Sequence, residues 1–177
     1  MMKLDWKIYA VGIGIILLVV MILFLEKVFL FLIIILVTLL LALILRFLHP
    51  VKYLGVELIT LSTMLVGVVY GPVIGGIYGF TMLLAHLIVG DYFIGTYLMW
   101  LLPEYVLLGV LSGIFGAGII GPLGVSFIIG MNLLNLILTF VGENERFAKE
   151  LPFAVGNTVI NSILLIQFFG LIVNFIG

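Results

Sequence analysis

The sequence predicts an all-α protein, a polytopic transmembrane bundle of six to seven helices. Hydrophobic residues make up 66% of its 177 residues and charged residues 8%, and its mean hydropathy is +1.52. A soluble domain needs roughly a quarter of its residues charged to keep its surface hydrated. The apolar residues also fall in runs of about eighteen, the length that crosses a bilayer as a helix. We therefore expect a single integral domain over residues 1–177, passing several times through the cell membrane.

The composition also narrows the class of function. Seven Lys and Arg residues are too few for a nucleic-acid-binding face, and the absence of Cys excludes disulfides and thiolate chemistry. The chain carries no nucleophile–base constellation and no phosphate-binding loop. Its two His residues are not at ligand spacing, because His86 lies near the end of a span and His49 lies in a connection. We therefore expect neither an enzyme nor a bound metal or cofactor, and we expect partners other than nucleic acid.

The first two spans are expected at residues 8–25 and 28–45, joined by a turn at Glu26-Lys27. The first run has no small-residue cleavage site and is followed by a second apolar run, so it is predicted to be a retained helix, not a signal peptide. The second run is almost entirely Leu, Ile, Val and Phe, which is typical of a helix that faces lipid on most sides.

The next two spans, 54–70 and 73–89, are expected to form a hairpin around Gly71-Pro72 at the centre of the bundle. Proline lacks an N–H and glycine tolerates a positive φ, so this pair favours a compact turn. Gly75 and Gly79, four residues apart, expose a stripe of backbone that another helix can approach closely.

The rest of the chain is expected to hold an interfacial loop at 90–97 and three further spans at 101–120, 123–141 and 153–175. Tyr92, Tyr97 and Trp100 suit the aromatic belt of the membrane interface. Gly121-Pro122 is expected to turn the chain a second time, and 142–150 to form a charged loop. If Pro103 breaks a span, the count is six.

The distribution of Lys and Arg predicts a cytoplasmic N-terminus and an external C-terminus. With seven spans, one basic residue, Lys27, falls outside, and the others satisfy the positive-inside rule. The basic residues expected on the cytoplasmic side are Lys3, Lys7, Arg46, Lys52, Arg146 and Lys149.

Three ionisable residues within or near the spans are candidates for a site, because such groups are costly in lipid. Glu57 is either a carboxylate at a helix N-terminus or a gate or ligand contact at the mouth of the bundle. Glu104, after Pro103, either lines a cavity at a broken helix or sits in the first turn of a span. His86 is expected to bond a neighbour more readily than a ligand.

Four carboxamides lie on the faces of the last two spans, at helical spacing. Asn132 and Asn135 are three residues apart, and Asn157 and Asn161 are four apart. One interpretation is hydrogen bonding between the two helices, and the other is a polar wall for a small uncharged or zwitterionic ligand.

The central hairpin carries a distinctive set of residues: Lys52, Glu57-Leu58, Met64-Leu65, Gly67, Gly71-Pro72, Gly75 and Gly79. With these residues, the chain resembles the substrate-binding S components of energy-coupling factor transporters over roughly residues 50–120. The hairpin is followed by Asp91, Gly95 and Tyr97, and in this it is also similar to the rod-shape-determining membrane protein of bacterial cell-wall elongation.

The S-component resemblance implies a subunit, usually of six helices, that captures a vitamin or metal ion. It implies delivery to a transmembrane coupling subunit driven by two ATPases, with Ala10 and Gly14 in the place of the small-residue motif that docks this partner. Gly75 and Gly79 are expected to offer a second docking stripe. The expected ligand-contacting residues are Glu57, Trp100, Glu104, Asn132, Asn135, Asn157 and Asn161.

Our hypothesis is therefore a membrane-embedded subunit that captures a vitamin or similar small molecule for uptake. The alternatives are a non-catalytic scaffold subunit, like the rod-shape-determining protein, and an accessory subunit of a larger membrane complex.

Overall fold

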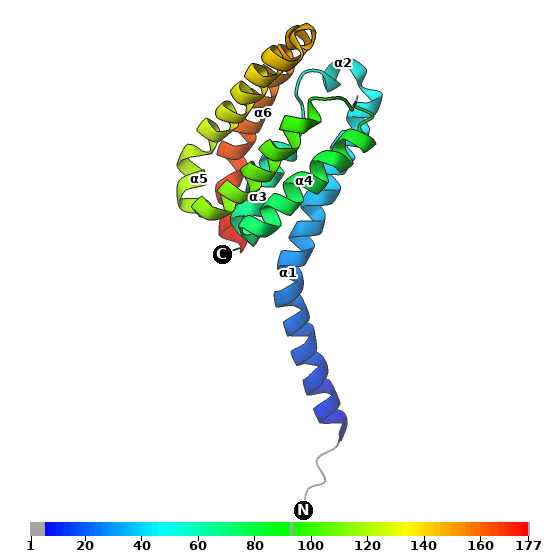
Figure 1. The fold of residues 1–177 in the computed structure, drawn as a ribbon. Coiled ribbons are helices and arrows are strands. Elements are labelled where there is room, and N and C mark those ends of the chain that lie inside the picture. The colour runs from blue at the N-terminus through cyan, green and yellow to red at the C-terminus, as the bar shows by residue number, and fades with distance from the viewer. Residues whose placement is uncertain (1–5, 93, 177) are drawn as a thin grey trace, which may run out of the picture. The chain divides into compact units, whose positions relative to one another are not determined.

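A computed structural model describes residues 6–92 and 94–176, in which all regular secondary structure is helical (Figure 1). The all-α prediction is confirmed. Helix α5 (Leu98–Gly142) consists of two consecutive helical parts, because Gly116 interrupts it with non-helical angles of φ 63° and ψ −175°. The elements are α1 (Trp6–Phe47), α2 (His49–Lys52), α3 (Ile59–Tyr70), α4 (Pro72–Val89), α5 (Leu98–Gly142) and α6 (Asn144–Ile176).

Four helices in the described part of the chain are long and apolar enough to cross a membrane. A fifth apolar helix, Ile59–Tyr70, is shorter. The four segments are Glu26–Phe47, Pro72–Val89, Leu98–Gly142 and Glu145–Val173.

The chain divides into two compact units, Met1–Ile33 and Ile34–Gly177. Helix α1 continues without interruption through Glu26 and Lys27, so the predicted turn there is wrong. The physical reason is that Glu and Lys are good helix formers and neither Gly nor Pro stands beside them to end the helix. In the first unit, Gly14 is exposed and has no described atom within 4 Å of an added Cβ. The side chain of Ala10 lies outside the described residues.

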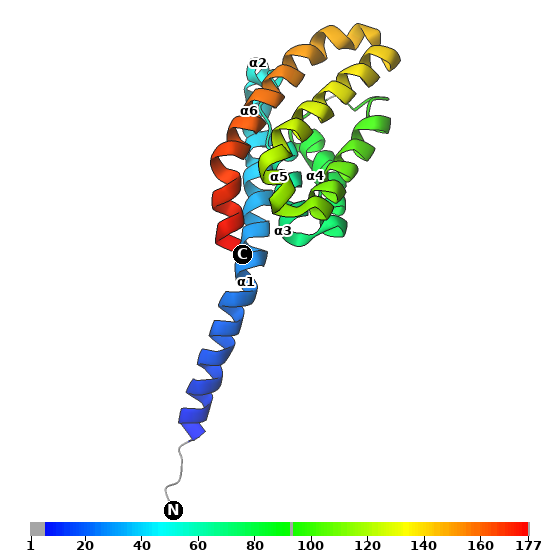
Figure 2. The ribbon, with the colours of Figure 1, turned by 90° about the vertical axis from the view of Figure 1, so that its left-hand side faces the viewer.

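Helix α3 is the centre of the second unit. It packs against α4, α5 and α6, and every residue from Ile59 to Gly67 is buried. Helix α4 buries one face and leaves the other exposed, so only the first half of the predicted hairpin is enclosed. The main apolar core joins α3 to both parts of α5 and to α6. The second part of α5 and α6 run side by side in both views (Figure 2). The core consists of Leu61, Met64, Leu65, Leu108, Ile120, Ile128, Leu165 and Phe169.

Glycines bring α4 into direct backbone contact with its neighbours. A Cβ on Gly75 would overlap the carbonyl oxygen of Gly109 on α5 and the Cα of Gly67 on α3. A Cβ on Gly79 would overlap the carbonyl oxygen of Tyr105. The stripe that the sequence offers to a partner is therefore covered by α5 of the same chain.

Gly109→Ala is expected to lower the free energy of unfolding by about 2 kcal/mol, the usual range for overpacking. The added methyl would overlap the backbone of Gly75 and Gly76, so α4 and α5 must separate. Thermal unfolding of the purified protein measures this change. Gly130→Ala, also on α5 but with no described atom within 4 Å, is the matched control and should unfold as the wild type does or slightly later. Equal melting of the two variants would contradict the close approach.

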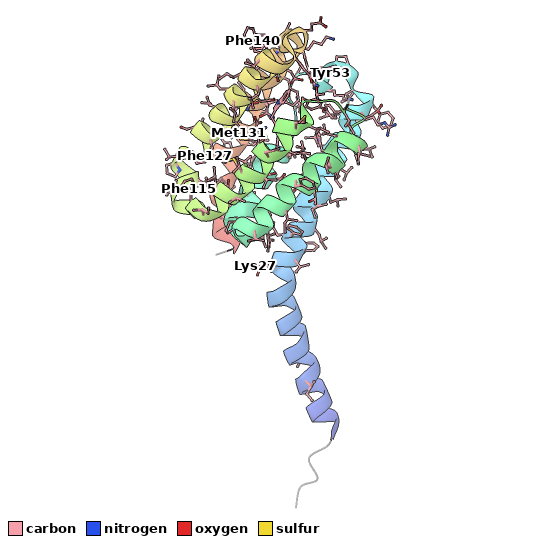
Figure 3. The ribbon with its side chains drawn as sticks, viewed as in Figure 1. Lys27, Tyr53, Phe115, Phe127, Met131 and Phe140 are labelled. Atoms are coloured by element: carbon pink, nitrogen blue, oxygen red, sulfur yellow. The ribbon has the colours of Figure 1, made fainter. Side chains whose placement is uncertain are left out.

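The Gly71-Pro72 turn is confirmed, and the second predicted Gly-Pro turn is wrong. Gly71 ends α3 with φ 90°, and Pro72 opens α4. By contrast Pro122 lies inside α5, and the bend falls at Gly116, which adopts a positive φ without the steric cost of a Cβ. The rings of Phe115 and Phe127 contact each other edge to face across this bend, with their centroids 5.7 Å apart (Figure 3).

The predicted charged loop at 142–150 is largely helical. Helix α5 ends at Gly142, Glu143 is its C-cap, and α6 begins at Asn144. Arg146 donates to Glu150 at 2.6 Å, four residues on, and lies 3.8 Å from Glu143, three residues back. Ion pairs at these spacings stabilise a helix, which explains why this polar segment forms the first turns of α6.

Candidate functional site

A cavity of about 1080 Å³ opens among the end of α4, the start of α5 and the junction of α5 with α6. Its volume lies just above the range of about 300–1,000 Å³ that is typical of small-molecule pockets. Tyr53, which follows α2, and Met131, on the second part of α5, belong to its walls (Figure 3). The other lining residues are Lys52, Leu54, Glu57, Ile59, Thr60, Leu83, His86, Leu87, Tyr92, Tyr97, Leu101, Glu104, Tyr105, Asn132, Asn135, Thr139, Glu143, Glu145, Arg146, Lys149, Glu150, Pro152 and Phe153.

The floor of the cavity is built around the buried N-terminus of α3. The first N–H groups of a helix have no partner within the helix and must find one elsewhere. The N–H groups of Ile59 and Thr60 donate to the Glu57 carboxylate, and that of Leu61 donates to Oδ1 of Asn161 at 3.2 Å. A carboxylate at this position is also favoured by the helix dipole. Glu57, which precedes the N-cap residue Leu58, therefore supplies the side chain that caps a helix beginning inside the protein.

Further donors complete the coordination of Glu57. The Thr60 hydroxyl donates to Glu57 Oε1 at 2.6 Å, which leaves Thr60 to accept from the Tyr105 hydroxyl, 3.1 Å away. The side-chain amides of Asn157 and Asn161 also donate to Oε1. In turn, Asn157 Oδ1 accepts from Asn132 Nδ2 at 2.9 Å. We call Glu57, Thr60, Asn132, Asn157 and Asn161 the Glu57 cluster.

The cluster shows how the structure uses the predicted ligand-contacting residues. Glu57 and Asn132 line the cavity, but the Glu57 carboxylate and the side-chain nitrogen of Asn132 form hydrogen bonds within the cluster. Asn157 and Asn161 are 1% and 0% exposed, and the described lining of the cavity does not include them. Asn132 on α5 and Asn157 on α6 therefore form a hydrogen bond between the two helices, as one of the two interpretations predicted. Asn157 and Asn161 also bond the residues that begin a third helix, α3.

Close backbone packing holds the cluster in place. The loop before α3 crosses α6 at Gly55 and Gly156, and Gly55 has φ 69°. A Cβ on Gly156 would overlap the carbonyl oxygen of Leu54, and a Cβ on Gly55 would overlap that of Phe153. Glycine at both positions lets this non-helical segment press against α6 and reach the asparagines.

Above this floor, three polar side chains face the cavity without partners. Glu104 Oε1, His86 Nδ1 and the Tyr92 hydroxyl are buried and have no hydrogen-bond partner among the described residues. Glu104 and His86 are each 4% exposed. The imidazole of His86 stacks on the Tyr92 ring, with centroids 5.0 Å apart. Buried polar groups are nearly always paired, so three unpaired groups in the wall of one cavity indicate a site where a bound molecule or water supplies the partner.

Lys52 connects α2 to the segment that follows α4. Its ammonium group donates to the carbonyl oxygen of Asp91 and lies 4.2 Å from the centroid of the Tyr92 ring. Burial lowers the pKa of Lys52, and the nearby Asp91 carboxylate opposes that shift. Burial also raises the pKa of the Tyr92 hydroxyl, so this group remains protonated and able to donate at neutral pH.

The rim of the cavity carries paired charges. Arg146 bonds Glu150, and its guanidinium lies 3.6 Å from the centroid of the Tyr97 ring. Thr96 donates to Glu143. Trp100 is absent from the described lining, but its indole N–H donates to Asn135 Oδ1 at 3.3 Å, so it positions a residue that does line the cavity.

Several lining residues were not predicted from the sequence. In the sequence, Lys52 was part of the pattern that resembles known families, and Tyr92 and Tyr97 were expected at the membrane interface. No role was predicted for Thr60 or Tyr105. Tyr105 had a usable signal, because it directly follows Glu104 at the start of the same span. The Lys52–Asp91 bond joins residues 39 apart, for which no local pattern exists.

Metal binding finds no support in the described residues: no group of three or more His, Asp or Glu side chains there is placed to hold an ion. Comparison with known proteins found no family model that matches the chain, no matching curated protein and no matching solved structure.

Proposed function

We propose that this protein is a multi-pass membrane subunit that captures a small organic molecule for uptake, as the S components of energy-coupling factor transporters do. The observation that carries the proposal is the cavity of about 1080 Å³ with the unpaired Glu104, His86 and Tyr92 in its wall. Apolar and aromatic walls with a few convergent polar groups are characteristic of small-molecule sites.

The distribution of paired and unpaired groups supports capture over a purely structural role. The Glu57 cluster is satisfied by its own hydrogen bonds and holds three helices together. The unpaired groups come from other elements of the lining, namely α4, the loop that follows it and the start of α5. A scaffold needs the cluster but gains nothing from buried groups that face an open volume.

The proposal is tested by titrating the purified full chain with a panel of water-soluble vitamins. We expect one member to bind with a dissociation constant of about 1 μM or tighter, a common affinity for a largely buried small ligand. We also expect a membrane subunit and ATPases to purify with the chain from its native cells. No binding across the panel, with cell-wall proteins purifying in their place, would favour the scaffold alternative.

A further inference from the structure

We propose that the molecule held in the cavity is an organic cation and that Glu104 receives its positive charge. This inference rests on the proposed capture function and names the chemical class of its substrate. It is carried by the placement of one carboxylate and by the state of the charges around it.

Glu104 differs from Glu57 in what surrounds its oxygens. The Glu57 carboxylate accepts hydrogen bonds from two backbone N–H groups, one hydroxyl and two amides. Glu104 is 4% exposed, and its Oε1 has no partner in the part of the chain that the structure describes. Burying a carboxylate without a partner is strongly unfavourable, so a partner from outside the chain accounts for its presence.

Two of the three basic groups in the lining of the cavity, Arg146 and Lys52, are engaged elsewhere. Arg146 is held by Glu150, Glu143 and the ring of Tyr97. Lys52 is held by the Asp91 carbonyl and the ring of Tyr92. Overall the lining contains five Glu residues against three Lys and Arg residues, a composition that favours a cation over an anion.

The shape and chemistry of the walls favour an organic cation over a metal ion. The described residues offer no cluster of three His, Asp or Glu ligands, which a bound metal ion needs. The walls of the same cavity include the apolar or aromatic side chains of Leu87, Leu101, Tyr105 and Met131, which belong to one packed cluster. These surfaces suit a flat apolar body that ends in a charged nitrogen. The unpaired His86 Nδ1 and Tyr92 hydroxyl provide a second polar contact on the same molecule.

A series of three pyridine derivatives isolates the effect of charge. The probes are 1-methylnicotinamide, a cation, nicotinamide, which is neutral, and nicotinate, an anion. Calorimetric titration of the full chain in detergent should give binding of the cation about tenfold tighter than of the neutral probe, with the anion weakest. In the isosteric variant Glu104→Gln, binding of the cation should weaken by about thirtyfold, and binding of the neutral probe should stay within about twofold of wild type.

Two controls separate binding from folding. Glu26→Gln makes the same change of charge at an exposed residue of α1 outside the described lining, and it should bind all three probes as the wild type does. The melting temperature of ligand-free Glu104→Gln should equal or exceed that of the wild type, because the variant removes a buried carboxylate that has no partner. A fall in melting temperature of about 5 °C would instead assign Glu104 a structural role and overturn the inference.

Failure of this inference can be told apart from failure of the proposed function. If the neutral or anionic probe binds as tightly as the cation, or if the panel yields an anionic ligand, the charge assignment is overturned and capture stands. If Glu104→Gln keeps the preference for the cation, the assignment to Glu104 is overturned. If neither the vitamin panel nor the three probes bind, both proposals fall.

Discussion

Asn161→Leu is expected to lower the free energy of unfolding by about 3 kcal/mol or more, the range for leaving buried polar and charged partners unpaired. Leucine has the branched side-chain skeleton of asparagine but can neither donate nor accept a hydrogen bond. Its methyl groups are also larger than the amide atoms that they replace, so overpacking adds to the loss at this fully buried position. The substitution leaves the Leu61 N–H without an acceptor and removes donors from the carboxylate and the carbonyl oxygen of Glu57. Reversible unfolding in mixed micelles measures the loss.

The size of this effect distinguishes helix capping from ordinary association of membrane helices. A single hydrogen bond between such helices contributes about 0.6 kcal/mol on average. Ser162→Ala is the matched control, because Ser162 is the next residue on α6 and its buried hydroxyl has no partner among the described residues. We expect it to change stability by less than about 0.5 kcal/mol. A loss below about 1 kcal/mol for Asn161→Leu would contradict the role of Asn161 at the N-terminus of α3.

A double-mutant cycle tests whether Glu57 and Asn161 act as one unit. Residues in one buried network show strong interaction energies, whereas distant residues add independently. We expect the loss in the Glu57→Gln, Asn161→Leu double variant to be smaller than the sum of the two single losses by about 1 kcal/mol or more. Additive losses would show that the two residues stabilise the protein separately.

Gly156→Ala is expected to destabilise the protein by about 3 kcal/mol, the upper part of the usual range for overpacking. Its methyl group would collide with the carbonyl oxygen of Leu54, a backbone atom that cannot rotate away as a side chain can. The loop before α3 must then lift from α6 and draw Glu57 away from the asparagines. Stability is measured by thermal unfolding, and the integrity of the cavity by binding of the tightest member of the vitamin panel.

Gly170→Ala is the control for this variant, since it lies on the same helix and has no described atom within 4 Å of the added Cβ. It should unfold at or slightly above the wild-type temperature, because alanine favours a helix over glycine. Gly55→Ala approaches the same crossing from the other side and also forces a positive φ on a residue with a Cβ. If Gly55→Ala and Gly156→Ala both melt like Gly170→Ala, the crossing is not as close as described.

Local sequence signals predicted the elements whose causes are local. The turn at Gly71-Pro72 followed from the conformational preferences of two adjacent residues, and the structure has it. The turn at Glu26-Lys27 was predicted from polarity alone, and the helix continues because polarity does not break a helix. The bend of α5 falls at Gly116 and not at Gly121-Pro122, because packing of the two parts of α5 decides which glycine adopts a positive φ.

The candidate site was predicted less completely, because its contacts are distant in sequence. Spacing placed Asn157 and Asn161 on one helical face, and their polarity required partners inside an apolar protein. Their bonds to Glu57 join residues 100 and 104 positions apart, so no pattern within one helix could identify that partner. The position of Glu104 after Pro103 made it a candidate from the sequence. Only the tertiary structure shows that its Oε1 has no partner among the described residues.

By itself the sequence determined that this protein is a bundle of apolar helices and that each of its few polar residues inside the spans needs a specific partner. Composition suffices for this, because the free energy of burying a side chain depends first on its own chemistry. Only the tertiary structure decided which polar groups satisfy one another and which face a cavity. That decision depends on close backbone approaches, such as Gly55 against α6 and Gly75 against α5, which bring together side chains from different helices.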